Sequence, residues 1–309
     1  MYDLIGDLHG HADELEQLLR QLGYRKIHGV YRHPDRKVVF LGDFIDRGPR
    51  IPQVLQIARS MVESDAAFAV MGNHEWNAIA YHTEDPEAPD EFLRRRTPAN
   101  ARQISRTIEQ LGPANLASYL EWFKTLPLWL ELDGLRAIHA CWDDSAIAIL
   151  DPALVNAGGV TPSFLKPAST LGNELFHSVE VVLKGKEAAL PEGMSFLDKD
   201  GSPRVHVRTR WYLPPTGHTY HSYAFETAGI DCHHPLENTI IAQSMPYPTT
   251  AKPVFIGHYW LSHQHPQILA DNVACLDFSV AKGGFLCAYR WDGEKKLSND
   301  NFVRVGVEN

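Results

Sequence analysis

The chain has 309 residues, of which 44% are hydrophobic, and its formal net charge is −9 at pH 7. This length corresponds to about two domains or one large α/β domain, and the hydrophobic content supports a sizeable core. The acidic balance argues against a general nucleic-acid-binding protein, which would present a basic surface, so any attraction for phosphate must be local.

The cysteine pattern and the first residues bear on the cellular compartment. The four cysteines show no CxxC spacing, which indicates reduced thiols and no disulfide framework. No signal peptide precedes the first strand pattern, and no segment approaches the roughly 18 consecutive apolar residues of a membrane span. We therefore expect a cytoplasmic protein without a membrane partner.

Three short apolar strand patterns near the amino terminus, at residues 2–6, 38–41 and 66–71, each lead into polar residues. Helical patterns with apolar residues at i, i+3 and i+4 lie between them, and this alternation predicts three adjacent parallel strands. Carboxyl ends of parallel strands meet at one edge of a sheet, where open α/β sheets place their ligands. The polar residues expected at that edge are Asp7, His9, Asp43, Asn73 and His74. Their oxygen and imidazole groups suit divalent metal ions.

The segment GDFIDRGP at residues 42–49 carries Asp43, Asp46 and Arg47 in one short loop after the second strand pattern. Gly48 and Pro49 end this loop before the next helical pattern, so its charges are held on a rigid turn. An ordinary capped surface turn is the alternative interpretation, because short motifs match by chance.

The middle of the chain begins with a polar stretch at residues 83–98 that includes three consecutive arginines, Arg94 to Arg96. We interpret this run as a solvated helix face and do not assign it to the site. Helices are expected at 101–111 and 114–126, with Pro113 as a break. Residues 128–140 predict a hairpin around Asp133 and Gly134, and His139 ends its second strand. Beside the upstream residues, His139 is a candidate metal ligand.

Residues 143–250 have a weaker pattern, and we expect a cap or insertion there within a single domain spanning residues 1–309. A helix is predicted at 171–184 and a strand at 205–212. Arg208 and Arg210 alternate with apolar and hydroxyl residues, so they would share one face of the strand. Two guanidinium groups on one face suit a phosphate, and structural ion pairing is the alternative.

The last third of the chain returns to strand patterns, at residues 253–257, 273–278, 285–291 and 302–305. These should build a second sheet. His258 directly follows the first of them, as Asp43 follows its own strand, which makes His258 the last candidate ligand.

Five motifs in order, GDLHG, GDFIDRGP, GNHE, IHA and IGH, resemble those of the calcineurin-like metallophosphoesterases and, within them, the phosphoprotein phosphatase family. The resemblance covers residues 6–258, with the expected cap poorly matched. It implies an α/β sandwich of two mixed sheets flanked by helices. It also implies two metal ions, one held by Asp7, His9 and Asp43, and a second that Asp43 bridges to and that Asn73, His139 and His258 hold.

The resemblance further implies a mechanism. Mixed nitrogen and oxygen ligands favour Mn, Fe or Zn over Ca or Mg, and we place Mn first. The two cations would lower the pKa of a shared water, and the hydroxide would attack phosphorus in line. His74 would protonate the departing oxygen while Asp46 orients its imidazole. Arg47, with Arg208 or Arg210, would hold the nonbridging oxygens.

The substrate expected from the sequence is a nucleotide polyphosphate or another small phosphoester. The segments GHYW, VRTRWY and LDFSVAKGGFLCAYR resemble bacterial symmetrical diadenosine tetraphosphatases. Ser279 and Met71 depart from the patterns of related phosphatases, which often have glycine and arginine there. A serine/threonine phosphoprotein phosphatase is the alternative enzyme, and a non-catalytic metal-binding or nucleotide-binding module is the alternative from another class.

Overall fold

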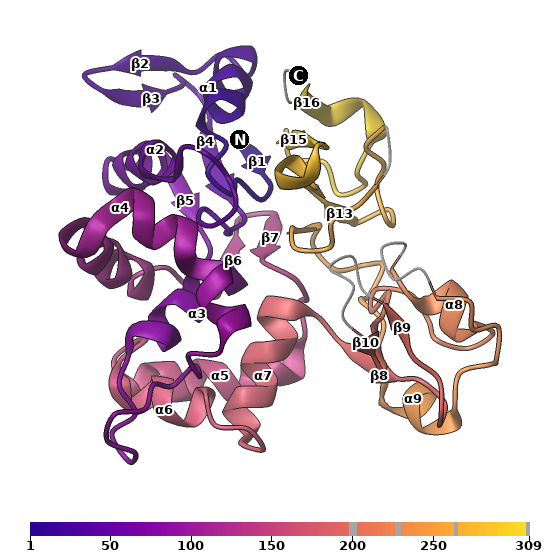
Figure 1. Cartoon of the computed structure of the whole chain (residues 1–309). Helices are drawn as coiled ribbons and strands as arrows, with labels where there is room; N and C mark the ends of the chain where they lie inside the picture. Colours follow the sequence, from indigo (N-terminus) through magenta and orange to yellow (C-terminus); the bar gives the residue numbers. More distant parts are fainter. Residues whose placement is uncertain (198–202, 226–229, 263–264, 307–309) are drawn as a thin grey trace.

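The computed structural model describes residues 1–197, 203–225, 230–262 and 265–306 (Figure 1). In this part of the chain, six strands form the larger sheet, in the order β14-β15-β1-β4-β5 with β16 paired to β15. The strands are β1 (Tyr2–Ile5), β4 (Lys37–Phe40), β5 (Ala67–Ala69), β14 (Asp277–Phe278), β15 (Phe285–Trp291) and β16 (Phe302–Gly306). β1, β4 and β5 are parallel neighbours, as predicted, so their carboxyl ends share one edge.

The second sheet has four strands in the described residues, in the order β13-β12-β7-β6. They are β6 (Trp129–Leu132), β7 (Leu135–Ile138), β12 (Val254–Ile256) and β13 (Val273–Cys275). β6 and β7 form the predicted hairpin, and β12 pairs parallel to β7. The amide of Gly257 donates to the carbonyl of His139 (2.8 Å), so His139 and His258 lie at adjacent strand ends.

The two-sheet α/β architecture agrees with the predicted fold class, but the expectation that the strands of the last third build a second sheet is wrong. Of these strands, β12 and β13 join the smaller sheet, whereas β14, β15 and β16 extend the larger sheet beside β1. The strand pattern at 273–278 is divided between the two sheets, because β13 belongs to the smaller sheet and β14 to the larger. Leu276 lies between them, and its amide donates to the carbonyl of Ile256 (2.8 Å). This crossing segment connects the two sheets close to the candidate site.

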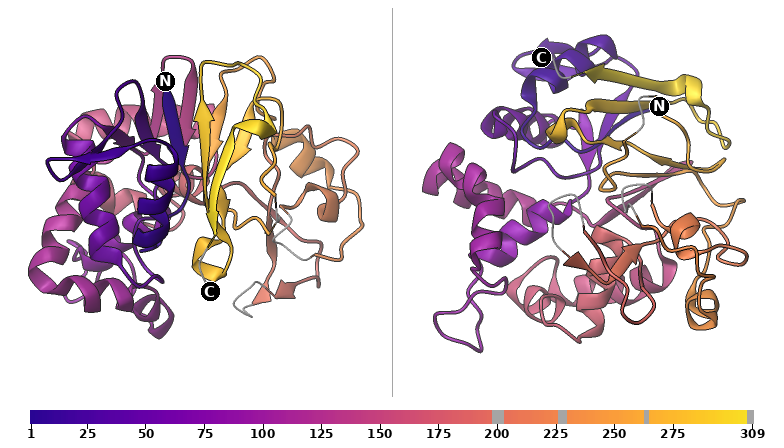
Figure 2. Two further views of the ribbon diagram at one scale, coloured as in Figure 1. Left: turned by 90° about the horizontal axis from the view of Figure 1, so that it is seen from above. Right: turned by 45° about the vertical axis from the view of Figure 1, so that its right-hand side comes forward.

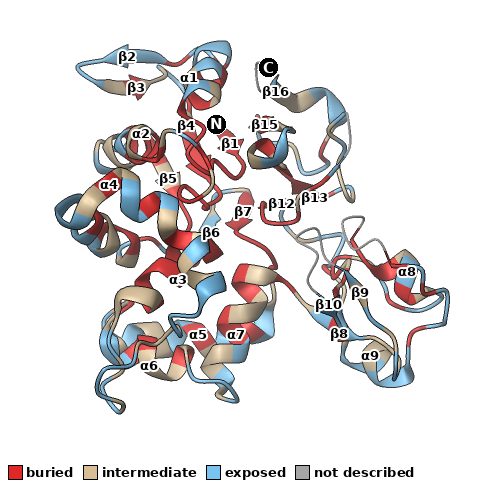
Figure 3. Ribbon diagram, in the orientation of Figure 1, coloured by how far each residue is buried: buried red, intermediate tan, exposed pale blue. Residues whose placement is uncertain are grey.

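Seven helices accompany the sheets within the described residues. They are α1 (Ala12–Gln21), α2 (Ile51–Glu63), α3 (Asn73–His82), α4 (Pro98–Lys124), α5 (Asp144–Ala157), α6 (Pro162–Ala168) and α7 (Glu174–Lys184). α1 packs against β15 and β16, and α2 packs against β5 and α4. The two helices expected around Pro113 form α4, which has a sharp kink at Gly112 (φ 67°). Buried residues are concentrated in the strands and on the helix faces toward them (Figure 3).

The described residues of 187–197, 203–225 and 230–243 form a lobe on the opposite side of the molecule from α1, α2 and α4 (Figures 1 and 2). Its elements are β8 (Glu187–Ala189), β9 (Phe196–Leu197), β10 (Pro203–Arg204), β11 (His206–Arg208), α8 (Tyr220–Tyr223) and α9 (Asn238–Gln243). The strand expected at 205–212 is shorter than predicted, since β11 ends at Arg208. The lobe has its own small core, which includes Val207, Tyr220 and Tyr223.

Helices α5, α6 and α7 lie within the range expected for the cap, yet their apolar side chains pack into the main core. The predicted cap boundary at residue 143 therefore remains a prediction. Three smaller elements complete the description: the hairpin of β2 (Arg25–Ile27) and β3 (Val30–Arg32), and the 3₁₀ turns η2 (Val280–Lys282) and η3 (Asn299–Asn301). Among the described helices, none combines the length and the hydropathy needed to cross a bilayer.

Candidate functional site

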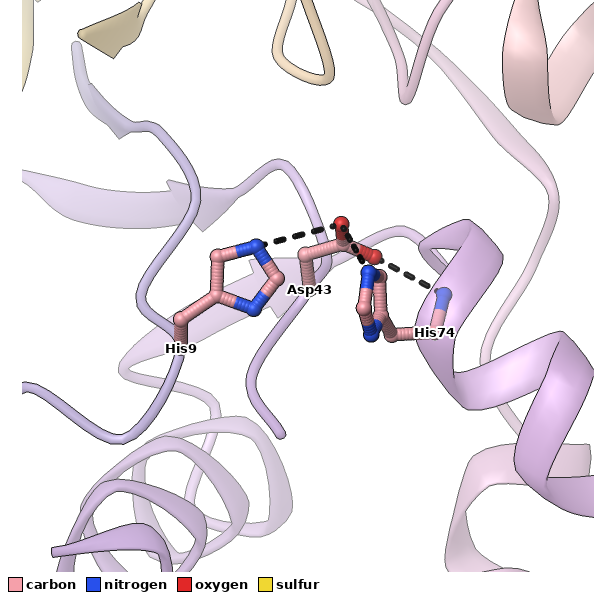
Figure 4. A group of neighbouring side chains, drawn as sticks. All are labelled: His9, Asp43 and His74. Atoms are coloured by element: carbon pink, nitrogen blue, oxygen red, sulfur yellow. Dashed lines mark hydrogen bonds and ion pairs between the residues drawn. The ribbon is translucent and has the colours of Figure 1, made fainter. Parts of the chain in front are cut away.

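The carboxyl ends of β1 and β4 and the start of α3 bring His9, Asp43 and His74 together (Figure 4). One Asp43 oxygen, Oδ2, lies 3.6 Å from His9 Nε2 and 3.8 Å from His74 Nε2. All three residues are buried. Their potential ligand atoms all lie within 4.8 Å of one another, a spacing that could hold a metal ion.

A second group of potential ligands lies on the other side of Asp43. It consists of Asp43, His139 and His258, whose ligand atoms also lie within 4.8 Å of one another. Asp43 Oδ1 is 3.4 Å from His139 Nε2. The amide oxygen of Asn73 lies between the two imidazoles, 3.0 Å from His139 Nε2 and 2.7 Å from His258 Nδ1. Asp43 therefore uses a different oxygen toward each group, as a bridging carboxylate does.

Asp7 lies next to this second group at the end of β1. Both of its carboxylate oxygens accept from the backbone amide of His258 (3.2 Å each). A Cβ at residue 257 would collide with the Asp7 carboxylate, so the glycine of the GH motif allows this close approach. Burial and the charges of Asp277 and Asp43 raise the pKa of Asp7 well above its ordinary value. A carboxylate in such surroundings requires nearby positive charge.

The orientation of the imidazole rings fits metal binding. His139 Nδ1 donates to the carbonyl of Leu41 (2.6 Å), and His9 Nδ1 donates to the carbonyl of Ile45 (2.7 Å). In a neutral ring the other nitrogen, Nε2, then carries a lone pair, and both Nε2 atoms face oxygen acceptors. Burial lowers the pKa of His139, but Asp43 and Asp7 raise it more, to about 10. The site thus favours a cation between these atoms, and the carbonyl partners orient the rings as in many metal sites.

One further atom of the site is left without a partner. His258 Nε2 is buried and makes no hydrogen bond to any residue that the structure describes. Burial and the charge of Arg208 lower the pKa of His258 well below its ordinary value, which favours a neutral ring. A neutral imidazole is the form that binds a metal ion, and with the oxygens nearby the donor set suits Mn, Fe or Zn.

Several site residues adopt left-handed backbone conformations that non-glycine residues rarely take. They are His9 (φ 40°), Asp43 (φ 50°), Asp46 (φ 68°), Arg47 (φ 67°), His258 (φ 71°) and Trp260 (φ 51°). Such conformations cost free energy and persist only where surrounding contacts enforce them. Here they turn each loop sharply after its strand, so that the side chains point back toward the shared edge.

His74 is held on its other side by Asp46. Its Nδ1 lies 2.6 Å from Asp46 Oδ2, and Asp46 Oδ1 accepts from the hydroxyl of Thr107 (2.5 Å). The side-chain amide of Gln103 lies 3.2 Å from the same His74 nitrogen. Thr107 and Gln103 belong to α4, and the sequence pattern did not indicate either residue. No local signal could have found them, because only the packing of α4 brings them to the site.

Glu75 holds the loop that carries Asp43. Its buried carboxylate accepts from the backbone amides of Asp43 (2.8 Å), Phe44 (2.9 Å) and Gly72 (3.0 Å). Burial and the charge of Asp43 raise the pKa of Glu75 to about 7. In the sequence, the position of Glu75 within the GNHE motif is the only sign of a role for this residue, and no role is predicted for it from the sequence.

Arg47 spans the opening between the two histidines of the first group. Its Nη1 lies 3.2 Å from His9 Nε2, and its Nη2 lies 3.4 Å from His74 Nε2. The guanidinium also stacks on Trp260, with Cζ 3.9 Å from the ring centroid. Asp277 fixes the Trp260 loop by accepting from its backbone amide (2.8 Å). Neither Trp260 nor Asp277 was predicted as a site residue.

The two candidate arginines of the lobe are placed differently. Arg208 is close enough to His258 for its charge to influence the pKa of that imidazole. Arg210 donates from Nε to the carbonyl of Ala224 (3.0 Å) within the lobe. The structure thus brings the predicted metal ligands together with His74, Asp46 and Arg47, whereas Arg208 is related to them only through its charge and Arg210 bonds within the lobe.

Comparison with known proteins adds a family and a fold. Residues 2–222 match the profile of the family described as calcineurin-like phosphoesterase. A bis(5'-nucleosyl)-tetraphosphatase PrpE [asymmetrical] from Oceanobacillus iheyensis is 32% identical over 140 residues, which cover 45% of this chain and 54% of that protein. The protein of the same name from a Geobacillus species is 33% identical over 146 residues, covering 45% and 55%. The chain spans about half the length of these curated relatives.

Among solved structures, the cold-active protein-tyrosine phosphatase of a psychrophilic Shewanella species superposes with a TM-score of 0.54 and 17% identity. The match covers 99% of this chain and 80% of that one. A likeness at this level of identity concerns the fold alone.

Proposed function

Because the chain belongs to the calcineurin-like phosphoesterase family, we propose that it is a hydrolase that uses two divalent metal ions to cleave phosphoester or phosphoanhydride bonds. The observation that carries this proposal is the position of Asp43, whose two oxygens each face a separate group of buried nitrogen and oxygen ligands. A single structural metal ion would not require such a shared carboxylate.

The proposed ligand sets take every member of the two groups except His74, which is left to proton donation, and add Asp7 and Asn73. The first ion would be held by Asp7, His9 and Asp43, and the second by Asp43, Asn73, His139 and His258. When bound, such ions would polarise the phosphoryl group and activate a water molecule as the nucleophile. Mn is the first expectation, with Fe or Zn as alternatives, because the ligands combine imidazole nitrogen with carboxylate and amide oxygen.

His74 is the proposed general acid. Because its Nδ1 faces the Asp46 carboxylate at 2.6 Å, the proton available to the substrate is the one on Nε2, the atom that faces Asp43 and Arg47. Asp46 would stabilise the protonated imidazole and fix its ring orientation. The proton would pass to the oxygen of the departing group as its bond to phosphorus breaks.

Two arginines are the proposed partners of the nonbridging phosphoryl oxygens. Arg47 lies at the opening of the site and is held in place by Trp260. Arg208 approaches from the lobe, and no hydrogen bond or ion pair joins its guanidinium to another described residue. Both guanidinium forks could therefore turn toward an anion, where charge develops in the transition state.

Nucleotide polyphosphates are the proposed substrate class. Support comes from the relatives named bis(5'-nucleosyl)-tetraphosphatase, which match this chain over about half of their own length. The His74 and Asp46 pair argues against a non-catalytic module, because a binding protein has no use for an oriented proton donor.

The test is a substrate panel with purified enzyme and Mn(II), comparing a dinucleoside tetraphosphate, a mononucleotide and a phosphopeptide by product chromatography. We expect the tetraphosphate to have the highest kcat/KM. Products of ATP and AMP would indicate asymmetrical cleavage, and two ADP molecules would indicate symmetrical cleavage. A preference for the phosphopeptide of about tenfold, or 1.4 kcal/mol of transition-state stabilisation, would overturn the nucleotide assignment in favour of a phosphoprotein phosphatase.

A further inference from the structure

Three cationic side chains from distant segments gather beside the candidate metal centre. They are Arg94, which follows α3, Lys184 at the carboxyl end of α7, and Arg208 in β11. Arg94 and Arg208 are both close enough to Lys184 for their charges to lower its pKa, in addition to the larger effect of burial. The charges of Lys184 and Arg208 also reach His258. We call these three residues the cationic subsite.

The solvated helix face predicted for the arginine run is wrong for Arg94. This residue is half-buried outside a helix, whereas Arg95 and Arg96 are exposed. Its guanidinium donates to the amide oxygens of Asn77 (2.9 Å), Asn100 (2.9 Å) and Gln103 (3.1 Å). Three neutral acceptors orient the group without neutralising it, and the charges of Glu180 and Asp46 offset only part of the effect of its burial.

The protein balances the charge of the cationic subsite only in part, because Glu180 is shared between Lys184 and Arg94. Lys184 forms an ion pair with Glu180 one helical turn earlier. Within the described part of the chain, no carboxylate pairs with Arg94 or Arg208. Half-buried like charges repel one another, and the fold has to compensate this cost unless an anion joins them. An anionic ligand would remove the repulsion.

Within the cationic subsite, Arg94 lies on the His74 side of the site, from which the leaving group would depart. Gln103 connects Arg94 with His74, since its Oε1 accepts from Arg94 and its Nε2 lies 3.2 Å from His74 Nδ1. The charge of Asp46 also reaches Arg94. If His74 protonates the departing oxygen, the remainder of the leaving group extends toward Arg94 and Lys184.

We propose that Arg94 and Lys184, next to Arg208 at the attacked phosphoryl group, bind the phosphate chain of the leaving group, so that the enzyme favours phosphoanhydrides over phosphomonoesters of alcohols and phenols. This inference rests on the proposed hydrolase function. In the reaction, water adds to the attacked phosphorus, the anhydride P–O bond breaks, and its electron pair stays on the oxygen of the departing phosphate. Cations at that position stabilise the negative charge as it develops.

The experiment uses Arg94→Gln, Lys184→Gln and the double variant, with Arg95→Gln as the matched control because Arg95 is exposed. Inhibition of p-nitrophenyl phosphate hydrolysis by inorganic tripolyphosphate is compared with inhibition by orthophosphate, with free Mn(II) in excess. We expect the tripolyphosphate inhibition constant to rise about tenfold in the double variant, as for lost charge-assisted hydrogen bonds. Orthophosphate inhibition should change much less, and Arg95→Gln should leave the ratio of the two constants unchanged.

A second measurement avoids metal chelation by the inhibitor. Tripolyphosphate should raise the melting temperature of metal-free wild-type protein more than that of the double variant. Arg94→Lys and Lys184→Arg keep the positive charges. They should therefore retain most of the inhibition by tripolyphosphate and most of the rise in melting temperature, which separates the effect of lost charge from that of a folding defect. An unchanged inhibitor ratio in a folded double variant would overturn the subsite. Failure of the wild type to hydrolyse any substrate of the panel would instead count against the proposed function.

Discussion

Individual side chains at the site have separable tasks. Asp43 touches both candidate ligand groups, whereas His74 is tied to Asp46 and faces the site with one nitrogen only. Loss of Asp43 should therefore remove metal ions, and loss of His74 should remove a proton donor while leaving most ligands in place.

We predict that His74→Asn lowers kcat by roughly 10² to 10⁴ for a substrate with a poor leaving group, the usual effect of removing a positioned general acid. The loss should be smaller with p-nitrophenyl phosphate, whose leaving group needs no proton. Metal content, measured by elemental analysis, should stay near normal in His74→Asn and fall in Asp43→Asn. Loss of metal from His74→Asn together with its retention in Asp43→Asn would contradict these roles.

A second residue-scale prediction concerns Glu75, whose carboxylate accepts from several backbone amides. Glu75→Gln replaces one acceptor oxygen by a donor that faces those N–H groups. We expect the free energy of unfolding to fall by about 1 to 3 kcal/mol, the cost of unsatisfied buried groups. Glu63→Gln is the control, because Glu63 forms an exposed ion pair with Arg59 that should contribute little. If Glu75→Gln and Glu63→Gln lower the free energy of unfolding equally in denaturant titrations, this role of Glu75 is contradicted.

At the scale of elements, α4 supports His74, the proposed general acid, through Asp46. Gln103 and Thr107 are four residues apart and so lie on the same face, before the kink at Gly112. The Thr107 hydroxyl donates to Asp46 Oδ1 and accepts from the Asp46 amide (3.0 Å). The helix thereby fixes the carboxylate that in turn fixes His74.

We predict that Thr107→Val, which nearly conserves volume, lowers kcat about fivefold through a misoriented Asp46, comparable with losing one hydrogen bond of about 1 kcal/mol. The loss should depend on the leaving group as the His74→Asn defect does. Ser105→Ala is the control on the same helix, since its hydroxyl bonds only to the carbonyl of Arg102. A uniform loss across leaving groups would mean that Thr107 acts through general stability instead.

An element could be predicted from the sequence where its pattern lies within a few neighbouring residues, and could not where its role depends on packing against distant segments. β1, β4 and β5 are buried on both faces, so each is a nearly continuous apolar run, and the polar residue that ends it marks the site edge. Thr107 escaped prediction because its role depends on how a distant helix docks. Arg94 was misread because an arginine run is normally solvated, and only the amides around it distinguish it from Arg95.

At the scale of the whole molecule, the candidate ligands tie both sheets together. Asp7, His9, Asp43 and Asn73 belong to the edge of the larger sheet, and His139 and His258 to the smaller one. Metal ions would therefore cross-link the two sheets in the folded state only. Their removal should affect stability as well as activity.

We predict that a chelator abolishes turnover and lowers the melting temperature, and that Mn(II) restores both. Ions present at 100 times their dissociation constant would stabilise the fold by about 2.7 kcal/mol per site. Thermal unfolding with and without chelator measures the effect, and Asp43→Asn should show little response to either treatment. Full activity after exhaustive chelation, with no metal found by elemental analysis, would contradict the metal assignment.

The order of strands in the larger sheet has a consequence for biosynthesis. β1 pairs with β4 on one side and with β15 on the other, so its second neighbour is made only after some 280 residues have been translated. Until then the nascent chain carries an open strand edge, the kind of surface that recruits other chains. His258 also emerges late. Any ion that His258 helps to hold could therefore bind only after translation has passed residue 258, and a ribosome that stalls before residue 285 would leave a product that has an incomplete sheet and is prone to aggregate.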